Sequence, residues 1–478
     1  MTEVRSEQTY DAIVIGAGPV GENVADRLVK GGLSTLLIES ELVGGECSYW
    51  ACMPSKALIR PAVALNNARS LAGSREAITG DLDVTAVLQR RDSFAAHWQD
   101  DGQVAWVKGA NISLARGKAW LLGERTVEIS GADEAGTRLA HARHAVVLAT
   151  GSVPSPPKIP GLSEISYWGT REATSAQRIP ASLLVIGGGV AGTELAQIYA
   201  RLGSKVSQLV RGKVLGKIPD PARELVATGL RQDGVDLREG VGFKQLSRSA
   251  SGVRLELDDG QVLEAEELLV ATGRIPALSE LALDNLDLPD FDGKQLSTDQ
   301  SGRVKGTDWL YAVGDAAGKA LLTHQGKYEA RITGDAIAAM VKGAFDGVAE
   351  PWSKYAQTAD QYAVPSVIFT DPEVATVGRT VEQAEADGLV VIEVSLPIAV
   401  AGSSLYVDDY QGWAQLVIDG DRNTIVGATF AGPDVAELLH GATIAIVGEV
   451  PLHRLWHAVP SYPTISEVWL RLLEKLGL

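Results

Sequence analysis

The sequence lacks the features that mark a membrane, secreted or nucleic-acid-binding protein. No run of apolar residues approaches the roughly eighteen that a membrane-spanning helix needs. Residues 1–10 are too polar for a secretory signal. The formal net charge is −17, and no basic stripe is present that could bind the phosphates of a nucleic acid. We therefore expect a cytoplasmic protein with neither a membrane nor a nucleic-acid partner.

Cysteine is scarce, with two residues in the chain, and both lie in the segment 44–56, Gly-Gly-Glu-Cys-Ser-Tyr-Trp-Ala-Cys-Met-Pro-Ser-Lys. Cys47 and Cys52 are five positions apart, near enough in a helical or turning backbone for one S–S bond. A purely structural bridge over so short a loop would contribute only about 2 kcal/mol. In a reducing compartment, cysteines are more often catalytic than structural. The pattern favours a redox-active pair, and no metal site is expected.

Size and composition indicate a folded protein of several domains. The 478 residues suffice for about three domains on the usual length prior. Hydrophobic residues make up 45% and charged residues 22%, which is near the average for soluble globular proteins. The 51 glycines suit a chain with several tight turns between strands and helices.

The chain opens with the pattern of a dinucleotide-binding unit. A buried apolar strand, 10–15, runs into Gly16, Gly18 and Gly21, and a helix follows. The glycines let the backbone approach a pyrophosphate that the helix N-terminus stabilises. The second strand ends at Glu39, where an acid is expected to bind a ribose hydroxyl.

The same pattern recurs after a cluster of four prolines between residues 154 and 160, which predicts a domain boundary near residue 155. A strand at 182–186 leads into Gly187, Gly189 and Gly192, and a helix is predicted over 191–202.

The strand that follows, 205–210, ends differently from its counterpart in the first unit. Arg211 stands where the first unit has Glu39, and Lys213 and Lys217 follow. A guanidinium compensates a 2′-phosphate, whereas an acid binds a free 2′-hydroxyl, so the sequence favours NADP over NAD. The alternative is that Arg211 is a solvated loop residue.

Other segments complete the expected order of elements. Apolar spacing predicts helices over 56–72 and 81–110, and short strands over 112–148 that end in Ala-Thr-Gly at 149–151. From residue 350 onward we expect strands at 364–369, 373–377 and 412–418, and helices near 434–447 and 466–476. The last helix carries an apolar stripe able to bury against a partner or within the chain.

Taken together, segment 44–56, the two glycine turns and the Ala-Thr-Gly tripeptides at 149–151 and 271–273 resemble the pyridine nucleotide-disulfide oxidoreductases, flavoproteins that include dihydrolipoamide dehydrogenase and glutathione reductase. The resemblance spans Asp11 to Glu467. It implies an α/β fold with two doubly wound, Rossmann-like dinucleotide-binding domains and a C-terminal α+β dimerisation domain, and it implies a homodimer. The expected domains are FAD-binding (1–155 and 275–349), NAD(P)-binding (156–274) and dimerisation (350–478).

The resemblance also assigns residues to two cofactors. For FAD these are Gly16, Gly18, Gly21, Glu39, Lys56, Gly117, Thr150, Gly151, Asp315, Leu322, Thr323 and His324. For NADP they are Gly187, Gly189, Gly192, Glu194, Arg211, Lys213 and Gly273. His324 and Gly117 could equally be a packed histidine and an ordinary turn.

The implied reaction passes hydride from NADPH to FAD, and electrons then pass through the Cys47–Cys52 disulfide to a small disulfide substrate. Cys52 is expected to contact the flavin while Cys47 exchanges with the substrate. Lys56, paired with Glu194, is expected to place positive charge near the flavin.

The C-terminal segment departs from the family pattern. Glu467 keeps its place, but Tyr462 stands where relatives have a catalytic histidine, and a phenol with a pKa near 10 is a poor base at neutral pH. His457 is a possible substitute. Mercuric ion reduction and the activity of high-molecular-weight thioredoxin reductases are disfavoured, because no further thiol is present. Two alternatives stay open: a quinone or dye reductase that stores electrons in the disulfide, and an NADPH-binding redox sensor.

Overall fold

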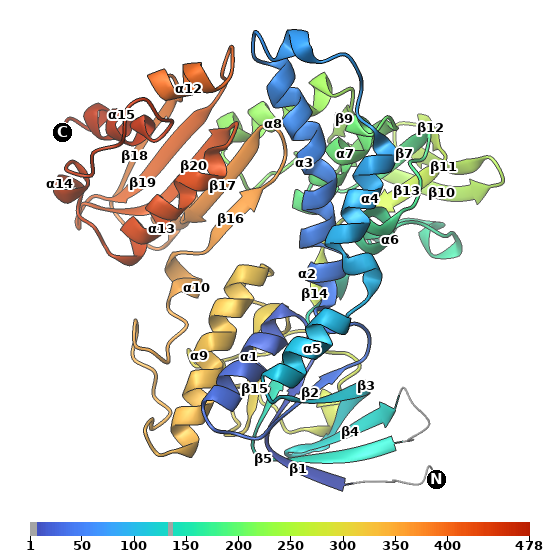
Figure 1. The fold of residues 1–478 in the computed structure, drawn as a ribbon, viewed down its shortest axis with the longest axis vertical. Helices are drawn as coiled ribbons and strands as arrows, with labels where there is room; N and C mark the ends of the chain where they lie inside the picture. The colour runs from blue at the N-terminus through green and yellow to red at the C-terminus, as the bar shows by residue number, and fades with distance from the viewer. Residues whose placement is uncertain (1–6, 132–136) are drawn as a thin grey trace. The chain divides into compact units, whose positions relative to one another are not determined.

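The computed structural model of the chain describes residues 7–131 and 137–478 (Figure 1). The fold divides into two compact units, each assembled from three separate stretches of sequence. The first contains residues 1–53, 92–155 and 274–360, and the second contains 54–91, 156–273 and 361–478.

The first unit is built on a sheet in which β1 (Glu7–Ile15) lies between β2 (Thr35–Glu39) and β5 (Thr137–Leu148), all three parallel. Strand β15 (Leu310–Ala312) extends the parallel sheet beyond β5. Residues Ala12 to Val14 are fully buried, as expected for a parallel strand covered on both faces. Helices α1 (Pro19–Lys30) and α9 (Thr323–Val341) pack side by side against this sheet (Figure 1).

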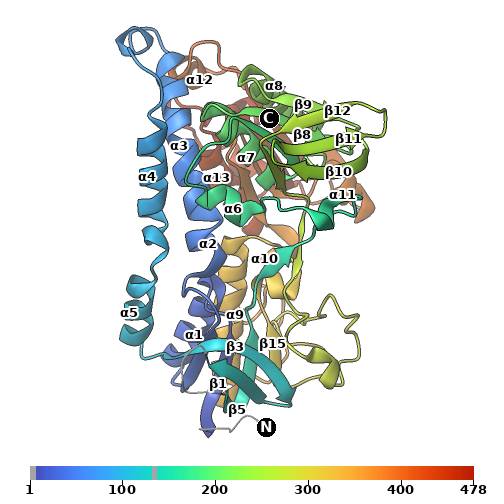
Figure 2. The same cartoon turned by 90° about the vertical axis from the view of Figure 1, so that its right-hand side faces the viewer.

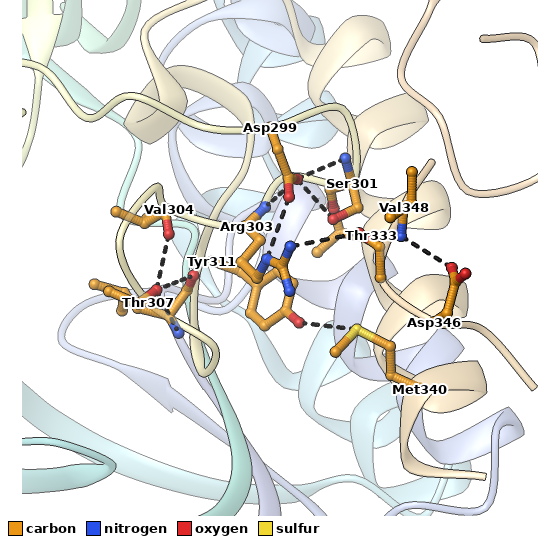
Figure 3. Close-up of polar contacts among 12 residues, drawn as sticks. Asp299, Ser301, Arg303, Val304, Thr307, Tyr311, Thr333, Met340, Asp346 and Val348 are labelled. Carbon is orange, nitrogen blue, oxygen red and sulfur yellow. Dashed lines mark hydrogen bonds and ion pairs between the residues drawn. The ribbon is translucent and has the colours of Figure 1, made fainter. Parts of the chain in front are cut away.

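Strands β3 (Ser113–Gly123) and β4 (Thr126–Gly131) belong to the same sheet. Strand β4 lies between β3 and β5 and pairs antiparallel with each of them. A polar turn at residues 299–303 fixes the chain just before β15 (Figure 3). Asp299 accepts hydrogen bonds from the backbone N–H of Ser301 (2.8 Å) and from Arg303 Nε (3.2 Å). The hydroxyl of Thr333, on α9, donates to the carbonyl of Ser301 (2.8 Å), so the turn is tied to that helix.

The second unit contains a parallel sheet in the order β13-β7-β8-β9. Its strands are β7 (Ser182–Ile186), β8 (Lys205–Val210), β9 (Asp236–Glu239) and β13 (Glu267–Val270). Helices α7 (Val190–Arg201) and α8 (Asp220–Gln232) belong to this part, and a three-stranded sheet of β10 (Phe243–Ser249), β11 (Gly252–Leu257) and β12 (Val262–Ala265) accompanies it (Figure 2).

The C-terminal part of the second unit is a five-stranded antiparallel sheet in the order β16-β17-β20-β19-β18. The strands are β16 (Pro365–Ile368), β17 (Glu373–Gly378), β18 (Val391–Pro397), β19 (Trp413–Asp419) and β20 (Thr424–Gly432). Helices α13 (Leu439–Val447) and α15 (Glu467–Lys475) follow the sheet. Two parallel-sheet nucleotide units with a C-terminal α+β part confirm the predicted α/β fold class.

The helix predicted over residues 81–110 is wrong as a single element. The structure has α4 (Val84–Phe94) and α5 (Asp101–Gly109), and the break lies at Ala96, His97 and Trp98, whose φ angles are +47°, +52° and +55°. Three consecutive residues in the left-handed region cannot continue a right-handed helix. Strand β18 and the short helix α12 (Ala401–Tyr406) were not predicted.

Candidate active site and nucleotide sites

The two cysteines lie on adjoining short elements. Cys47 is in α2 (Gly45–Tyr49), and Cys52 is the first residue of α3 (Cys52–Arg69). Both are thiols in this structure, and a hydrogen bond to Cys52 is the main cause that raises the pKa of Cys47, followed by burial. Cys52 Sγ also lies 3.4 Å from Thr323 Oγ1 at the start of α9. The two thiols therefore share a hydrogen bond in the reduced pair.

The backbone around the cysteines approaches the first glycine turn closely. A side chain at Gly45 would place its Cβ 2.8 Å from the Cα of Gly18, so only glycine fits there. Within the turn, a Cβ at Gly21 would lie 1.8 Å from the carbonyl oxygen of Gly16. These contacts set the start of α1 beside segment 44–56.

This turn has the features of a pyrophosphate and ribose site. Helix α1 begins after Gly18 with no side-chain cap, so its first N–H groups point to the turn. Glu39, at the end of β2, is 9% exposed and accepts hydrogen bonds from the backbone N–H groups of Ala17 (2.7 Å) and Glu41 (2.8 Å), while burial raises its pKa. A glycine-lined helix N-terminus with a carboxylate beside it fits the adenosine half of FAD.

The other predicted FAD residues lie in the same unit, with the exception of Lys56, which belongs to the second unit. Asp315 accepts a hydrogen bond from Ser152, which in turn accepts one from Arg274 Nε (2.7 Å). The hydroxyl of Thr150 donates to the carbonyl of Ala277 (2.9 Å). A Cβ at Gly151 would meet no atom within 4 Å, so the backbone there is open to a ligand.

The remaining predicted FAD residues divide between helix and sheet. Leu322 caps α9, and Thr323 and His324 form its first turn. Gly117 has a different explanation, because a Cβ there would lie 1.9 Å from the carbonyl oxygen of Ser130 on the paired strand. The close approach of β3 and β4 is therefore sufficient reason for a glycine at residue 117.

The second glycine turn, in the other unit, repeats the first. Gly187 has a φ of +140°, and a Cβ at Gly192 would lie 2.7 Å from the Gly187 carbonyl oxygen. Cβ atoms at Gly189 and at Gly273 would meet nothing within 4 Å. Helix α7 starts at Val190, directly after the turn, so this turn also presents open backbone at a helix N-terminus.

A glutamine buried behind this turn was missed by sequence reasoning. Gln208, on β8, is fully buried and donates from Nε2 to the Gly187 carbonyl (3.0 Å) and to Thr193 Oγ1 (3.1 Å). The corresponding position of the first unit is Leu37. The available signal was a polar residue directly before the apolar pair Leu209 and Val210 that ends the strand.

Arg211 follows β8 at the edge of the turn and is exposed. Its guanidinium carbon lies 5.4 Å from the centroid of the Phe243 ring, a cation–π distance. Lys213 forms an exposed ion pair with Asp220 (3.1 Å). Arg211 is thus the cation of this group that stacks on an aromatic ring, whereas Lys213 is engaged by a carboxylate.

Lys56 and Glu194 form an ion pair in the second unit. Lys56 Nζ lies 2.7 Å from Glu194 Oε2, and the Glu194 side chain is 5% exposed against 35% for Lys56. Lys56 lies one helical turn after Cys52 on α3. The structure therefore brings together the lysine and glutamate that the sequence had paired at a separation of 138 residues.

The C-terminal residues Glu467, Tyr462 and His457 have different surroundings in the structure. Glu467 is buried, and its Oε1 accepts a hydrogen bond from Arg471 Nη2 (2.8 Å), one turn later on α15. The Tyr462 side chain is 77% exposed, and His457 is exposed as well. The glutamate is thus held by an arginine of its own helix, and the four-residue spacing of the two residues could have predicted this pair from the sequence.

Comparison with known proteins agrees with this architecture. Residues 10–338 match the family described as pyridine nucleotide-disulphide oxidoreductase, and residues 364–472 match its dimerisation domain. Dihydrolipoyl dehydrogenase 2 of Haloarcula marismortui is 30% identical over 465 residues, covering 96% of this chain and 94% of that protein. The dihydrolipoyl dehydrogenase of Staphylococcus aureus is 28% identical over 476 residues, covering 97% and 96%.

Among solved structures, the HOCl-induced flavoprotein disulfide reductase RclA of Escherichia coli, in its Cu(II) complex, superimposes with a TM-score of 0.83 at 23% identity, covering 98% of this chain and 100% of that one. This likeness bears on the fold.

The fold and the site define a flavin-dependent oxidoreductase with a second nucleotide-binding unit and a redox-active cysteine pair. The chain belongs to the pyridine nucleotide-disulphide oxidoreductase family. It is accordingly an FAD-dependent enzyme that uses a pyridine nucleotide, and its dimerisation domain supports a homodimer. Among the described residues, no helix is long and apolar enough to cross a membrane, and no group of three or more metal-ligating side chains occurs.

Proposed function

We propose that the enzyme is an NADPH:disulfide oxidoreductase that reduces a small disulfide through Cys47 and Cys52. The observation that carries this proposal is the hydrogen-bonded pair of thiols in α2 and at the start of α3. Cys52 contacts Thr323, and the backbone at Gly45 approaches Gly18 of the first nucleotide turn. When bound, FAD supplies the two-electron transfer from the nicotinamide to the cysteine pair.

In the thiol half of the reaction, Cys47 gives up its proton and its sulfur attacks one sulfur of the substrate disulfide, and the other substrate sulfur leaves as a thiolate that takes up that proton. The Cys52 thiolate then attacks Cys47 Sγ in the mixed disulfide, which releases the second substrate thiol and forms the Cys47–Cys52 disulfide. One disulfide is reduced and one is formed, so the electrons balance.

Lys56 and Glu194 are proposed to support this chemistry electrostatically. The buried Glu194 carboxylate fixes the Lys56 ammonium at 2.7 Å, and such a fixed charge favours a reduced, anionic flavin. Because the ammonium is held in place before the reaction, it needs no reorganisation when charge develops.

The preference for NADPH rests on Arg211. An exposed guanidinium stacked on Phe243 at the end of β8 lies where the first unit has Glu39, and it suits a 2′-phosphate better than a 2′-hydroxyl. Gly187, Gly189 and Gly192 would hold the pyrophosphate at the start of α7.

A second candidate function is reduction of a quinone or dye, with the cysteine pair as an electron store. The arrangement at the C-terminus favours it specifically, because Glu467 is engaged by Arg471 and Tyr462 replaces the expected imidazole. Reduction of a quinone or dye involves no leaving thiolate that must be protonated, so the absence of the expected histidine would have little effect on it.

Steady-state rates with NADPH and a panel of acceptors separate the two functions. The panel contains lipoamide, glutathione disulfide, a benzoquinone and, because RclA was solved with it, Cu(II). Turnover of a disulfide that Cys47→Ser abolishes supports the leading proposal. Turnover of the quinone alone overturns it, and absence of turnover on every acceptor after rapid reduction by NADPH favours a redox sensor. We also propose a cytoplasmic location, because a cycling dithiol requires a reducing compartment.

A further inference from the structure

The segment Phe369–Glu373, Phe-Thr-Asp-Pro-Glu, joins β16 to β17 and has no role in the function proposed above. It is bound along one face of α7, by side chains spaced three and four residues apart. Gln197 exchanges two hydrogen bonds with the backbone of Asp371, both 2.8 Å long, and Arg201 Nη2 lies 2.8 Å from the Asp371 carboxylate. The segment is therefore held in one position on the helix that follows the second glycine turn.

The third residue on this face of α7 is Glu194, and it connects the segment to Lys56. The backbone N–H of Phe369 donates to Glu194 Oε1 (2.9 Å), while Glu194 Oε2 accepts from Lys56 Nζ (2.7 Å). With both oxygens engaged and the side chain 5% exposed, the carboxylate has a single orientation.

Phe369 makes a second contact with the same lysine. The Lys56 ammonium lies 4.7 Å from the centroid of the Phe369 ring, within the distance at which a cation is attracted to an aromatic face. One residue thus contacts both members of the ion pair, through its backbone N–H and through its ring.

We propose that Phe369 is a positioning residue for Lys56. Its N–H orients the Glu194 carboxylate, and its ring holds the ammonium through a cation–π contact. The action of this ammonium on the flavin rests on the proposed function. A purely structural role would require only an apolar side chain of similar size, so the proposal demands a dependence on the electrons of the ring.

The first experiment measures how fast the Lys56 amine is acetylated by an N-hydroxysuccinimide ester in the holoenzyme, with quantification by peptide mass spectrometry. Only the neutral amine reacts, so weaker stabilisation of the ammonium accelerates the reaction. We expect Phe369→Leu to raise the rate about fivefold and Phe369→Tyr to leave it at the native value. Phenylalanines carrying one, two and three ring fluorines at residue 369 should raise it stepwise, because fluorine withdraws electrons from the ring face.

The matched control is Phe243→Leu, which removes the ring beside Arg211 and should leave acetylation of Lys56 unchanged. The fluorinated variants keep the shape of Phe369, so they report on the ring even if Phe369→Leu disturbs folding. An equal acetylation rate across the fluorinated series would overturn the proposal.

The second readout is the two-electron midpoint potential of the bound flavin, measured in Phe369→Leu and in the fluorinated series. A fivefold loss of stabilisation of the reduced form corresponds to a fall of about 20 mV. A change in acetylation without a change in potential would uphold the role of Phe369 in holding Lys56 and would place the error in the proposed action of Lys56 on the flavin.

Discussion

Replacing Arg211 by glutamate reverses the one exposed charge that we assign to recognition of the nucleotide phosphate. Arg211 forms no ion pair with a carboxylate anywhere in residues 7–131 and 137–478, and its guanidinium is stacked on Phe243 at 5.4 Å. The cation is therefore pre-positioned, and no carboxylate competes with an incoming phosphate for it.

The expected loss follows from these contacts. A hydrogen bond between a guanidinium and a phosphate contributes about 2 kcal/mol, which is roughly a 30-fold change in the dissociation constant. In Arg211→Glu the new carboxylate also repels the phosphate, by about 1 kcal/mol for exposed charges near 4 Å apart. We expect the Kd for NADP⁺ to rise about 30- to 160-fold, with the Kd for NAD⁺ unchanged or lower, because a carboxylate can accept hydrogen bonds from a ribose 2′-hydroxyl.

Binding of NADP⁺ and NAD⁺ to the oxidised holoenzyme would be measured by isothermal titration calorimetry at about 50 and 200 mM salt, since exposed pairs are screened over this range. The oxidised nucleotides carry the same 2′-phosphate and 2′-hydroxyl as NADPH and NADH and do not reduce the flavin. Lys213→Glu is the matched control, because Lys213 is already paired with Asp220 and should contribute less than about fivefold. A ratio of the two dissociation constants that stays within about twofold of the native ratio in Arg211→Glu would refute the assignment.

Three further predictions follow from other contacts. Gln208→Leu introduces the residue type that stands at the corresponding position, Leu37, of the first unit. It should weaken binding of either nucleotide about tenfold and leave the FAD content unchanged, because two buried hydrogen bonds to the glycine turn are lost. Nucleotide affinities equal to those of the native protein would contradict this. Tyr462→His should raise disulfide turnover and give it a pH dependence near neutrality, without changing flavin reduction by NADPH in stopped flow; a fall in turnover would make Tyr462 an adapted donor or a substrate contact. Burial raises the pKa of the fully buried Glu329 from 4.5 to about 8, so the folded chain keeps a proton that the unfolded chain releases, and stability falls as the pH rises across this window. Between pH 5 and pH 8, the free energy of unfolding of Glu329→Gln, measured in urea, should therefore rise by up to about 4 kcal/mol relative to that of the native protein. The same pH dependence of this free energy in both proteins would exclude this role for Glu329.

The elements that the sequence predicted well are those encoded by short-range patterns. The strands at 182–186 and 205–210 have the predicted bounds, because apolar runs bounded by glycine and by charged residues leave little choice. The helix break at Ala96–Trp98 had no such signal, since these residues carry no glycine, proline or asparagine to mark a left-handed turn.

The parts of the site that were missed depend on contacts between distant segments. Phe369 meets Glu194 across 175 residues, and neither residue alone indicates the other. Glu194 could be paired with Lys56 in advance only through the family resemblance. By contrast, the pairing of Glu467 with Arg471 follows a four-residue helical spacing and could have been predicted.

We infer that the Cys47–Cys52 disulfide accepts electrons in addition to the flavin, and an anaerobic reductive titration measures this uptake. The oxidised holoenzyme would be titrated with dithionite, with the flavin spectrum recorded and the thiols counted after denaturation in alkylating reagent. The native protein should take up about two two-electron equivalents per flavin, and Cys47→Ser about one. Uptake of about one equivalent by both proteins, with no gain of thiols in the native enzyme, would show that the cysteine pair does not accept electrons.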